Sequence, residues 1–242
     1  MSAEPRPAFY ALAPGGWRDY VTLLHPPYTL WHLSYVAVGA GLATPFSWTR
    51  FAAALAAFAL ALGVGAHALD ELRGRPLQTR IPERTLWALA VASIGAATAI
   101  GGYACVAWTW LLAPFVVAGA FLVVAYNLEA FGGAFHSDVW FALAWGALPV
   151  LSAYVVQAET IRVEALAAAL YAALLSHAQR VLSTQVRETR RRVVTVTGRI
   201  ERDDGTAADV TRETLMASQE RALRVLGAGA VALGVALLAP HM

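Results

Sequence analysis

Three ionisable side chains lie within one helical turn at the end of an apolar run. His67, Asp70 and Glu71 are spaced i, i+3 and i+4, which places them on one helix face. Carboxylate oxygens suit Mg²⁺, which usually keeps some of its waters and bridges to phosphate oxygens. A histidine shifts the preference toward zinc or iron. The spacing therefore makes these three residues candidate metal ligands, with Asp70 first among them. The alternative is a helix end carrying solvated charges.

A group of arginines follows these acids. Arg73, Arg75 and Arg80 supply planar donors that match the oxygens of a phosphate. The residue before a proline avoids the helical region, so residues 75–82, with two prolines, are expected to be an extended loop. We expect this loop to hold Arg75 and Arg80 at the mouth of a helix bundle, where they would bind a phosphate-bearing substrate.

A second acidic position occurs far along the chain, where another apolar segment ends. Glu188 is the candidate partner of Asp70 in holding a metal, and Arg187 is a candidate phosphate ligand. His177 lies deeper in the same segment. It could be a metal ligand or a proton carrier, or it could simply form a hydrogen bond between helices.

A third polar cluster contains Tyr126, Asn127, Glu129, His136 and Asp138. Tyr126 and Asn127 stand at the edge of an apolar segment, where they could contact an acceptor molecule. The tryptophans that follow this cluster are typical of an interfacial aromatic belt.

The composition shows which elements must position these residues. The chain has 242 residues, of which 58% are hydrophobic and 14% are charged, and its mean hydropathy is +0.54. These values favour an all-α, polytopic membrane protein. A net charge of +2 gives no case for binding nucleic acid. Hydropathy predicts about seven spans, near Tyr28–Ala43, Phe51–Leu72, Leu86–Tyr103, Trp108–Leu128, Val139–Val156, Val163–Val186 and Leu223–Ala239.

Arginine placement predicts the orientation. Arginines flank the start of the first span and the ends of the second and sixth spans, which places these segments in the cytoplasm. The three polar clusters then share the cytoplasmic face and are expected to converge on one pocket between helices. Residues 1–26 are predicted to be a cytoplasmic segment without a cleaved signal, and residues 27–240 the membrane domain. Residues 187–218 are predicted to be a polar cytoplasmic loop that could act as a lid.

Several of these motifs together resemble the UbiA superfamily of intramembrane prenyltransferases, from about His25 to about Arg192. Gly65-Ala66-His67-Ala68-Leu69-Asp70, followed by Gly74-Arg75-Pro76-Leu77, is similar to the family's first aspartate-rich helix end and its Arg-Pro-Leu loop. Residues 184–192 fall where the family has its second acidic motif. Tyr126 and the stretch from Trp145 to Gln157 resemble the central tyrosine and the fifth-helix region.

The resemblance implies a ring of about seven helices around a central cavity. It implies transfer of a polyprenyl group from its diphosphate to a small or lipid acceptor, within a bacterial or archaeal cell membrane. Asp70 and Glu188 would act through Mg²⁺, and Arg75, Arg80 and Arg187 would bind the diphosphate. Such chemistry needs positive charge for the leaving group and a dry apolar tunnel.

Two other hypotheses stay open at this point. One is a metal-dependent membrane enzyme of redox or hydrolytic type, with a site built from His67, Asp70, Glu71, His136 and His177. The other is an isoprenoid- or lipid-binding membrane protein without turnover.

Overall fold

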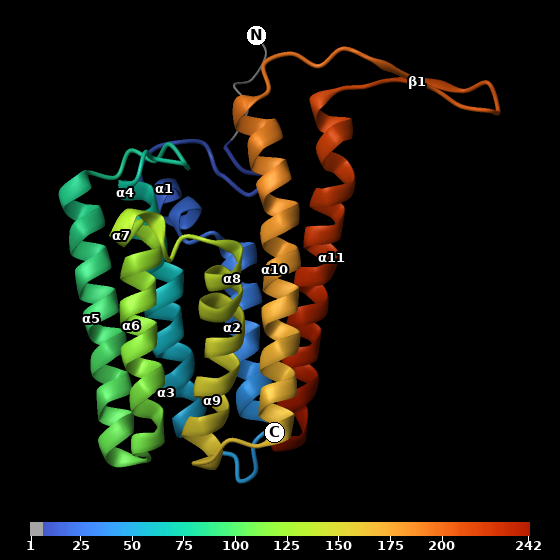
Figure 1. Cartoon of the computed structure of the whole chain (residues 1–242). Coiled ribbons are helices and arrows are strands. Elements are labelled where there is room, and N and C mark those ends of the chain that lie inside the picture. The colour runs from blue at the N-terminus through green and yellow to red at the C-terminus, as the bar shows by residue number, and fades with distance from the viewer. Residues whose placement is uncertain (1–6) are drawn as a thin grey trace.

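The computed structural model describes residues 7–242 and is helical apart from one short hairpin (Figure 1). Long helices run side by side, and shorter elements connect them at either end. The elements are α1 (Trp17–Leu23), α2 (Pro26–Gly41), α3 (Trp48–Phe58), η1 (Ala59–Ala66), α4 (His67–Leu72), α5 (Glu83–Ala107), η2 (Trp110–Leu112), α6 (Ala113–Asn127), α7 (Ala130–Gly133), α8 (Asp138–Phe141), η3 (Ala142–Ala147), α9 (Leu148–Ala158), α10 (Val163–Arg192), β1 (Arg199–Glu201), β2 (Ala207–Asp209), α11 (Arg212–Leu238) and η4 (Ala239–His241).

Six helical segments of the described chain are long and apolar enough to cross a membrane, which gives the chain the architecture of a polytopic helical membrane protein. They are Trp48–Leu72, Glu83–Ala107, Trp110–Asn127, Asp138–Ala158, Val163–Arg192 and Arg212–His241. The remaining predicted span corresponds to α2, which has 16 residues. At a rise of about 1.5 Å per residue, α2 is shorter than the hydrocarbon core is thick.

Helix α2 is nevertheless the centre of the packing, since α9 and α11 both lie against it. Small residues allow these close approaches. A Cβ atom added at Gly39 would stand 2.1 Å from the Val150 carbonyl oxygen of α9. One at Gly41 would stand 2.7 Å from the Leu237 carbonyl oxygen of α11. Trp31 and Tyr35 of α2 are fully buried in a hydrophobic cluster that also contains Val150. The Trp31 indole N–H donates to the Tyr35 hydroxyl at 2.6 Å.

Two membrane helices contain widened, π-helical turns close to the polar clusters. The first, η1, includes Gly63 and Gly65 and passes directly into His67. The second, η3, includes Trp145 and precedes Pro149, which has no N–H to donate to the Trp145 carbonyl. That oxygen accepts from His32 Nδ1 at 3.1 Å. Such turns are frequent at functional sites because they re-aim backbone and side-chain groups.

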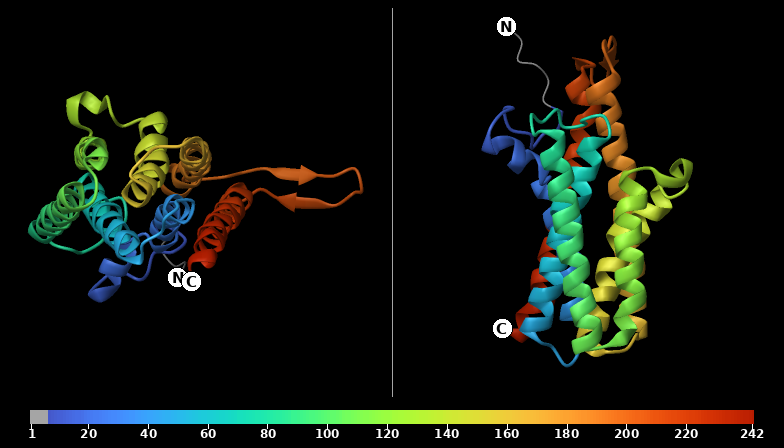
Figure 2. Two further views of the ribbon diagram at one scale, coloured as in Figure 1. Left: turned by 90° about the horizontal axis from the view of Figure 1, so that it is seen from below. Right: turned by 90° about the vertical axis from the view of Figure 1, so that its left-hand side faces the viewer.

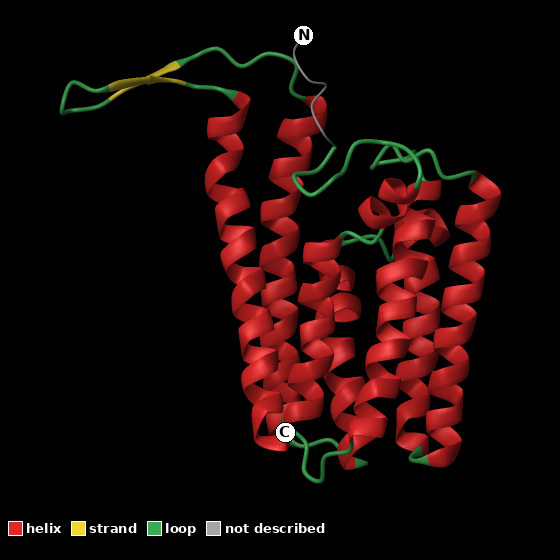
Figure 3. Cartoon of the chain, turned by 180° about the vertical axis from the view of Figure 1, so that it is seen from behind, coloured by secondary structure: helices red, strands yellow, loops and turns green. Residues whose placement is uncertain are grey.

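The three polar clusters lie at the same end of the bundle, as expected. This end holds the loops after α4 and after α6, the short helix α1, the C-terminal end of α10 and the N-terminal end of α11 (Figures 1 and 3). The C-terminus of the chain lies at the opposite end. The sequence pattern assigns this end to the cytoplasm, and that assignment remains a prediction.

The polar loop predicted at 187–218 is mostly regular structure. Helix α10 continues to Arg192, and α11 begins at Arg212 behind a Thr211–Thr214 capping box. Arg190 of α10 forms an ion pair with Glu220 of α11, which explains why both helices extend past the apolar run. The connection is an antiparallel hairpin of β1 and β2 that points away from the bundle (Figure 2). It therefore does not cover the helix ends as a lid.

The N-terminal segment packs over the polar end of the bundle. Residues 1–6 of the predicted segment 1–26 lie outside the described residues. Further along, Asp19 of α1 is buried, and its carboxylate accepts from the backbone N–H of Gly15 at 2.9 Å and of Arg80 at 2.9 Å. These hydrogen bonds join α1 to the loop after α4.

Candidate functional site

A polar cavity of about 470 Å³ lies at this end of the bundle. The N-terminal segment and helices α2, α4, α6, η3 and α10 all contribute to its lining. Its charged lining residues are the carboxylates Asp70 and Glu129 and the arginines Arg73, Arg180, Arg187, Arg190, Arg191 and Arg192. The lining is therefore strongly positive, which suits an anion.

Not all of these arginines are engaged within the protein. Arg73 pairs with Glu129 at 2.7 Å, and Arg180 pairs with Asp138 at 3.0 Å. Arg187 and Arg191 form no ion pair within residues 7–242, and Arg187 donates only to the Thr184 hydroxyl, at 3.0 Å. Both lie within electrostatic range of Asp70. Arg192 of the lining is also without an ion pair within residues 7–242, so three guanidinium groups are available, and two of them, Arg187 and Arg191, lie beside Asp70.

Glu71 does not line this cavity. Its side chain is 1% exposed, and its carboxylate accepts from the Leu77 N–H at 3.0 Å and from the N–H and hydroxyl of Thr79, each at 2.8 Å. Successive helical residues point about 100° apart, so Asp70 faces the cavity while Glu71 faces the loop. Glu71 was expected to be a metal ligand, but its carboxylate instead holds the loop after α4 in place.

The two loop arginines expected at the substrate also lie elsewhere. The Arg75 guanidinium donates to the carbonyl oxygens of Thr79 and Ile81, both at 2.9 Å, and its backbone has φ of +50°. Arg75 therefore closes its own loop. Arg80 is exposed, and neither side chain is part of the cavity lining.

Glu188 is exposed and lies outside the cavity lining, whereas its neighbour Arg187 is inside. The adjacent polar residue Gln185 contacts Gln219 of α11 at 3.4 Å, so this side of α10 is turned toward α11 and solvent. The expected pairing of Asp70 with Glu188 is not formed. Of the predicted ligands His67, Asp70, Glu71 and Glu188, only the first two line the cavity.

Three histidines of the lining have a defined hydrogen-bonding state. His32 Nδ1 lies 3.1 Å from the Trp145 carbonyl oxygen, and His67 Nδ1 lies 3.1 Å from that of Gly63. His136 Nδ1 lies 3.0 Å from the Tyr126 carbonyl oxygen. A carbonyl oxygen can only accept, so each Nδ1 carries a proton, and in this tautomer Nε2 is the acceptor atom of the ring. His136 Nε2 faces Arg180 at 3.4 Å.

The fourth histidine of the lining, His25, is the N-cap residue of α2. Its ring stacks on His67, with 4.1 Å between centroids and 9° between planes. Burial, and then the neighbouring His67, Arg191 and Arg187, hold the pKa of His25 well below its usual value, so the ring is neutral. Tyr10 packs against His25, and burial raises the pKa of Tyr10 above its usual range.

The two residues expected to contact an acceptor both line the cavity. The Tyr126 ring stacks on His136, with 4.4 Å between centroids, and packs at a tilt of 53° against Trp145, with 4.6 Å between centroids. The Arg180 guanidinium lies over the Tyr126 ring at 5.8 Å. The Tyr126 hydroxyl is buried and has no hydrogen-bond partner among the described residues. Asn127 donates to the Val123 carbonyl at 2.7 Å.

The five residues of the histidine–carboxylate hypothesis are not brought together. His67, Asp70 and His136 line the cavity, but Glu71 faces the loop and His177 is exposed on α10. Within residues 7–242, no three histidine, cysteine, aspartate or glutamate side chains are grouped so as to hold a metal ion.

The sequence pattern placed the polar segment 177–192 at the expected pocket, but it did not single out several lining residues as site residues, chiefly His25, Gln179, Arg180, Arg190 and Arg191. A signal for the α10 residues was present, because Arg180, Arg187 and Arg191 recur at i, i+7 and i+11, one face of a helix. No comparable pattern marks His25, since its neighbours in the site come from other elements.

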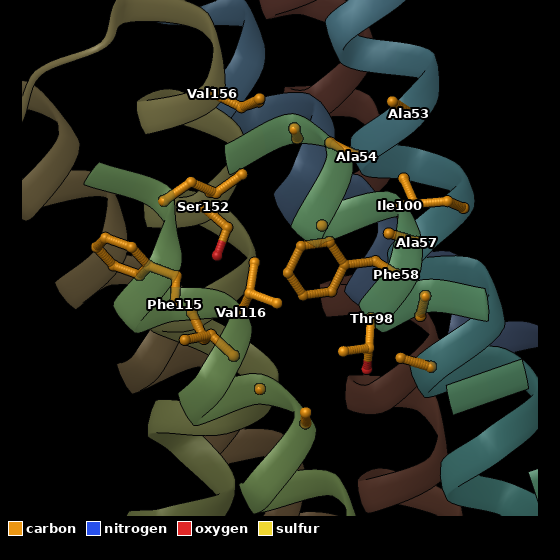
Figure 4. A pocket seen from close by; sticks show the side chains of 18 of the residues that line it. Ala53, Ala54, Ala57, Phe58, Thr98, Ile100, Phe115, Val116, Ser152 and Val156 are labelled. Carbon is orange, nitrogen blue, oxygen red and sulfur yellow. The ribbon is translucent and has the colours of Figure 1, made fainter. Parts of the chain in front are cut away.

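A second, apolar pocket of about 90 Å³ lies between α3, α5, α6 and α9 (Figure 4). Phe58, Phe115 and Val116 are among its lining residues, and Ser152 and Thr98 are its few polar ones. One packed cluster connects the two spaces: its members Phe58 and Val123 line the apolar pocket, and Tyr126 and Trp145 line the polar cavity.

Comparisons with family models, with curated protein sequences and with solved structures find no match to this chain. The resemblance to the UbiA superfamily therefore stands on the motifs in the sequence alone.

Proposed function

We propose that this chain binds a prenyl diphosphate at the polar end of the bundle and transfers its prenyl group to a small or lipid acceptor, in the manner of the UbiA superfamily. The observation that carries the proposal is the position of Arg187 and Arg191. These two arginines, unpaired within residues 7–242, line a cavity with Asp70 at the end of an apolar bundle.

The arginines suit the head group. A diphosphate carries charge that increases as it leaves, and guanidinium groups stabilise that charge by bidentate hydrogen bonds. Arg73 and Arg180 are already paired with carboxylates, so they contribute less than Arg187 and Arg191. Arg187 is also oriented by its hydrogen bond to Thr184.

Asp70 is the one carboxylate of the lining that forms no ion pair within the described chain. Mg²⁺ in phosphate-handling sites is often held by one or two carboxylates together with substrate oxygens, so Asp70 fits as a protein ligand. When bound, Mg²⁺ would neutralise charge on the leaving diphosphate.

The apolar pocket suits the hydrocarbon chain. Its lining is almost entirely apolar, and the packed cluster that contains Tyr126 and Trp145 joins it to the polar cavity. A prenyl chain directed into it would leave its first carbon near this cluster, where apolar rings exclude water from a reactive cation.

One observation favours a second candidate, binding of an isoprenoid without turnover. Because Glu188 is exposed outside the cavity, the second acidic group of the resemblance is absent from the lining. A protein with this arrangement could retain diphosphate binding and lack transfer.

Release of diphosphate tests the two candidates. Purified protein in lipid nanodiscs is given geranylgeranyl diphosphate, Mg²⁺ and a lipid extract that supplies candidate acceptors, so that the prenyl group can be transferred as diphosphate leaves. Transfer predicts Mg²⁺-dependent release that is lost in Asp70→Asn and Arg187→Leu but kept in Glu188→Gln. Saturable binding with no release supports the second candidate, and absence of binding to wild type contradicts both.

A further inference from the structure

The inner part of the polar cavity holds polar atoms that the protein leaves without partners. Within residues 7–242, the Tyr126 hydroxyl, the Gln179 Oε1 atom and the His25 Nε2 atom are buried and form no hydrogen bond, and a fourth such atom of the lining, Arg190 Nε, can only donate and so belongs with the arginines. Tyr126 is 5% exposed and Gln179 is 4% exposed. Since buried polar groups in folded proteins are almost always satisfied, a ligand group is expected to meet these atoms.

These atoms come from three separate elements. His25 is the N-cap residue of α2, Tyr126 is near the end of α6, and Gln179 is in the middle of α10. All three residues line the same cavity, although they are more than 50 residues apart in sequence. Packing of three elements toward one space, each with an unsatisfied polar atom, is the arrangement of a binding site rather than of a single misplaced side chain.

Gln179 Oε1 fixes one requirement that a ligand group must meet. An amide oxygen such as Gln179 Oε1 can only accept. His67, stacked on His25, has its Nδ1 proton directed to Gly63, so its Nε2 atom is also an acceptor. The Tyr126 hydroxyl can either donate or accept. A matching ligand group must therefore donate a hydrogen bond, and a fully ionised phosphate cannot do so.

We propose that the cavity has a second subsite, distinct from its arginines, that binds the neutral hydroxyl group of the acceptor substrate through Gln179 and Tyr126. This inference rests on the proposed function, and it names the acceptor as a hydroxyl-bearing molecule. A hydroxyl group donates to Gln179 Oε1 and accepts from the Tyr126 hydroxyl, which satisfies both atoms. The arginines remain available for the diphosphate.

The test compares hydroxyl compounds with their methyl ethers, which keep the carbon skeleton and the oxygen acceptor but lack the donor hydrogen. Dissociation constants are measured for geranylgeraniol and its methyl ether, and for phenol and anisole, with protein in phosphatidylcholine nanodiscs. We expect the hydroxyl compound of at least one pair to bind about tenfold more tightly than its ether, the effect of one buried hydrogen bond. The first pair represents a lipid alcohol and the second a small soluble acceptor.

Two variants and one control locate the effect. Gln179→Leu should bring the ratio of the two dissociation constants close to one, and Tyr126→Phe, which keeps the ring stack, should reduce it. Gln185→Leu on the same helix, where Gln185 faces α11, should leave it unchanged. A ratio near one for wild type in both pairs, or an undiminished ratio in folded Gln179→Leu and Tyr126→Phe, overturns the inference.

Binding of inorganic diphosphate by the same proteins separates this inference from the proposed function. If wild type binds diphosphate but does not distinguish hydroxyl from ether, only the second subsite is wrong. If it distinguishes them but does not bind diphosphate, the hydroxyl subsite stands and the prenyl diphosphate function is wrong. Gln179→Leu should bind diphosphate as wild type does.

Discussion

The imidazole ring of His25 lies flat against that of His67, with 4.1 Å between the ring centroids. This contact joins the N-cap residue of α2 to the first residue of α4, at the edge of the polar cavity. Two protonated rings at this separation would repel each other, and Arg187 and Arg191 add further positive charge nearby. The folded state therefore favours two neutral rings, and its stability is expected to depend on pH.

Stability should fall on acidification because of His25. Burial and the neighbouring His67, Arg191 and Arg187 lower the pKa of His25 in the folded state. Below the ordinary value of about 6.5, the unfolded chain takes up a proton that the folded chain excludes, so the free energy of unfolding decreases as pH falls. We expect the apparent melting temperature in nanodiscs to drop between pH about 7 and about 5.

The matched variants for this prediction are His25→Gln and His177→Gln. His25→Gln removes the titrating ring and should flatten the pH dependence. His177→Gln, at an exposed position on α10, should retain the wild-type slope. An unchanged slope in His25→Gln would contradict the assignment.

Glu71→Gln should destabilise the loop after α4. The substituted amide can accept only through its oxygen, while its NH₂ group would oppose one of the three donors that Glu71 now satisfies. The expected loss is about 1–3 kcal/mol in the free energy of unfolding, measured by steric trapping. Glu188→Gln, at an exposed position, should change it by less than about 0.5 kcal/mol. Equal effects of the two variants would argue against a loop-fixing role.

Arg187→Leu should weaken binding of inorganic diphosphate by about tenfold or more, since a charge-assisted hydrogen bond contributes roughly 1.5–3 kcal/mol. Arg199→Leu, in the exposed hairpin away from the bundle, should have no effect. Titration calorimetry measures both. Raising the salt concentration should weaken wild-type binding less steeply than it would at a fully exposed site, because the cavity is partly enclosed.

Gly39→Ala should destabilise the bundle. The added Cβ would stand 2.1 Å from the Val150 carbonyl oxygen, which is backbone and cannot swing away, so α2 and α9 must separate. We expect a loss of about 1–3 kcal/mol. Gly95→Ala is the control, because the space around Gly95 is open and alanine is the better helix former. A Gly39→Ala protein as stable as Gly95→Ala would show that the two helices are not in tight contact.

Hydropathy and arginine placement were sufficient to predict a helical membrane bundle with its three polar clusters at one end. The apolar runs are long enough to require helices in lipid, and six of them form such helices in the described chain. Tyr126, Asn127, Asp70 and Arg187 all line one cavity, and each lies where an apolar run meets a polar cluster. Their roles in that cavity stay predictions.

The sequence by itself determined which residues reach that end of the bundle, since span length and charge fix their depth along each helix. Only the tertiary structure decided which side chains face the cavity. Arg187 faces it and Glu188 does not, and Asp70 faces it while Glu71 holds a loop, because neighbouring helical residues point about 100° apart. The rotation of each helix is set by packing contacts such as Gly39 against Val150 and Gln185 against Gln219, and these join residues from distant parts of the chain.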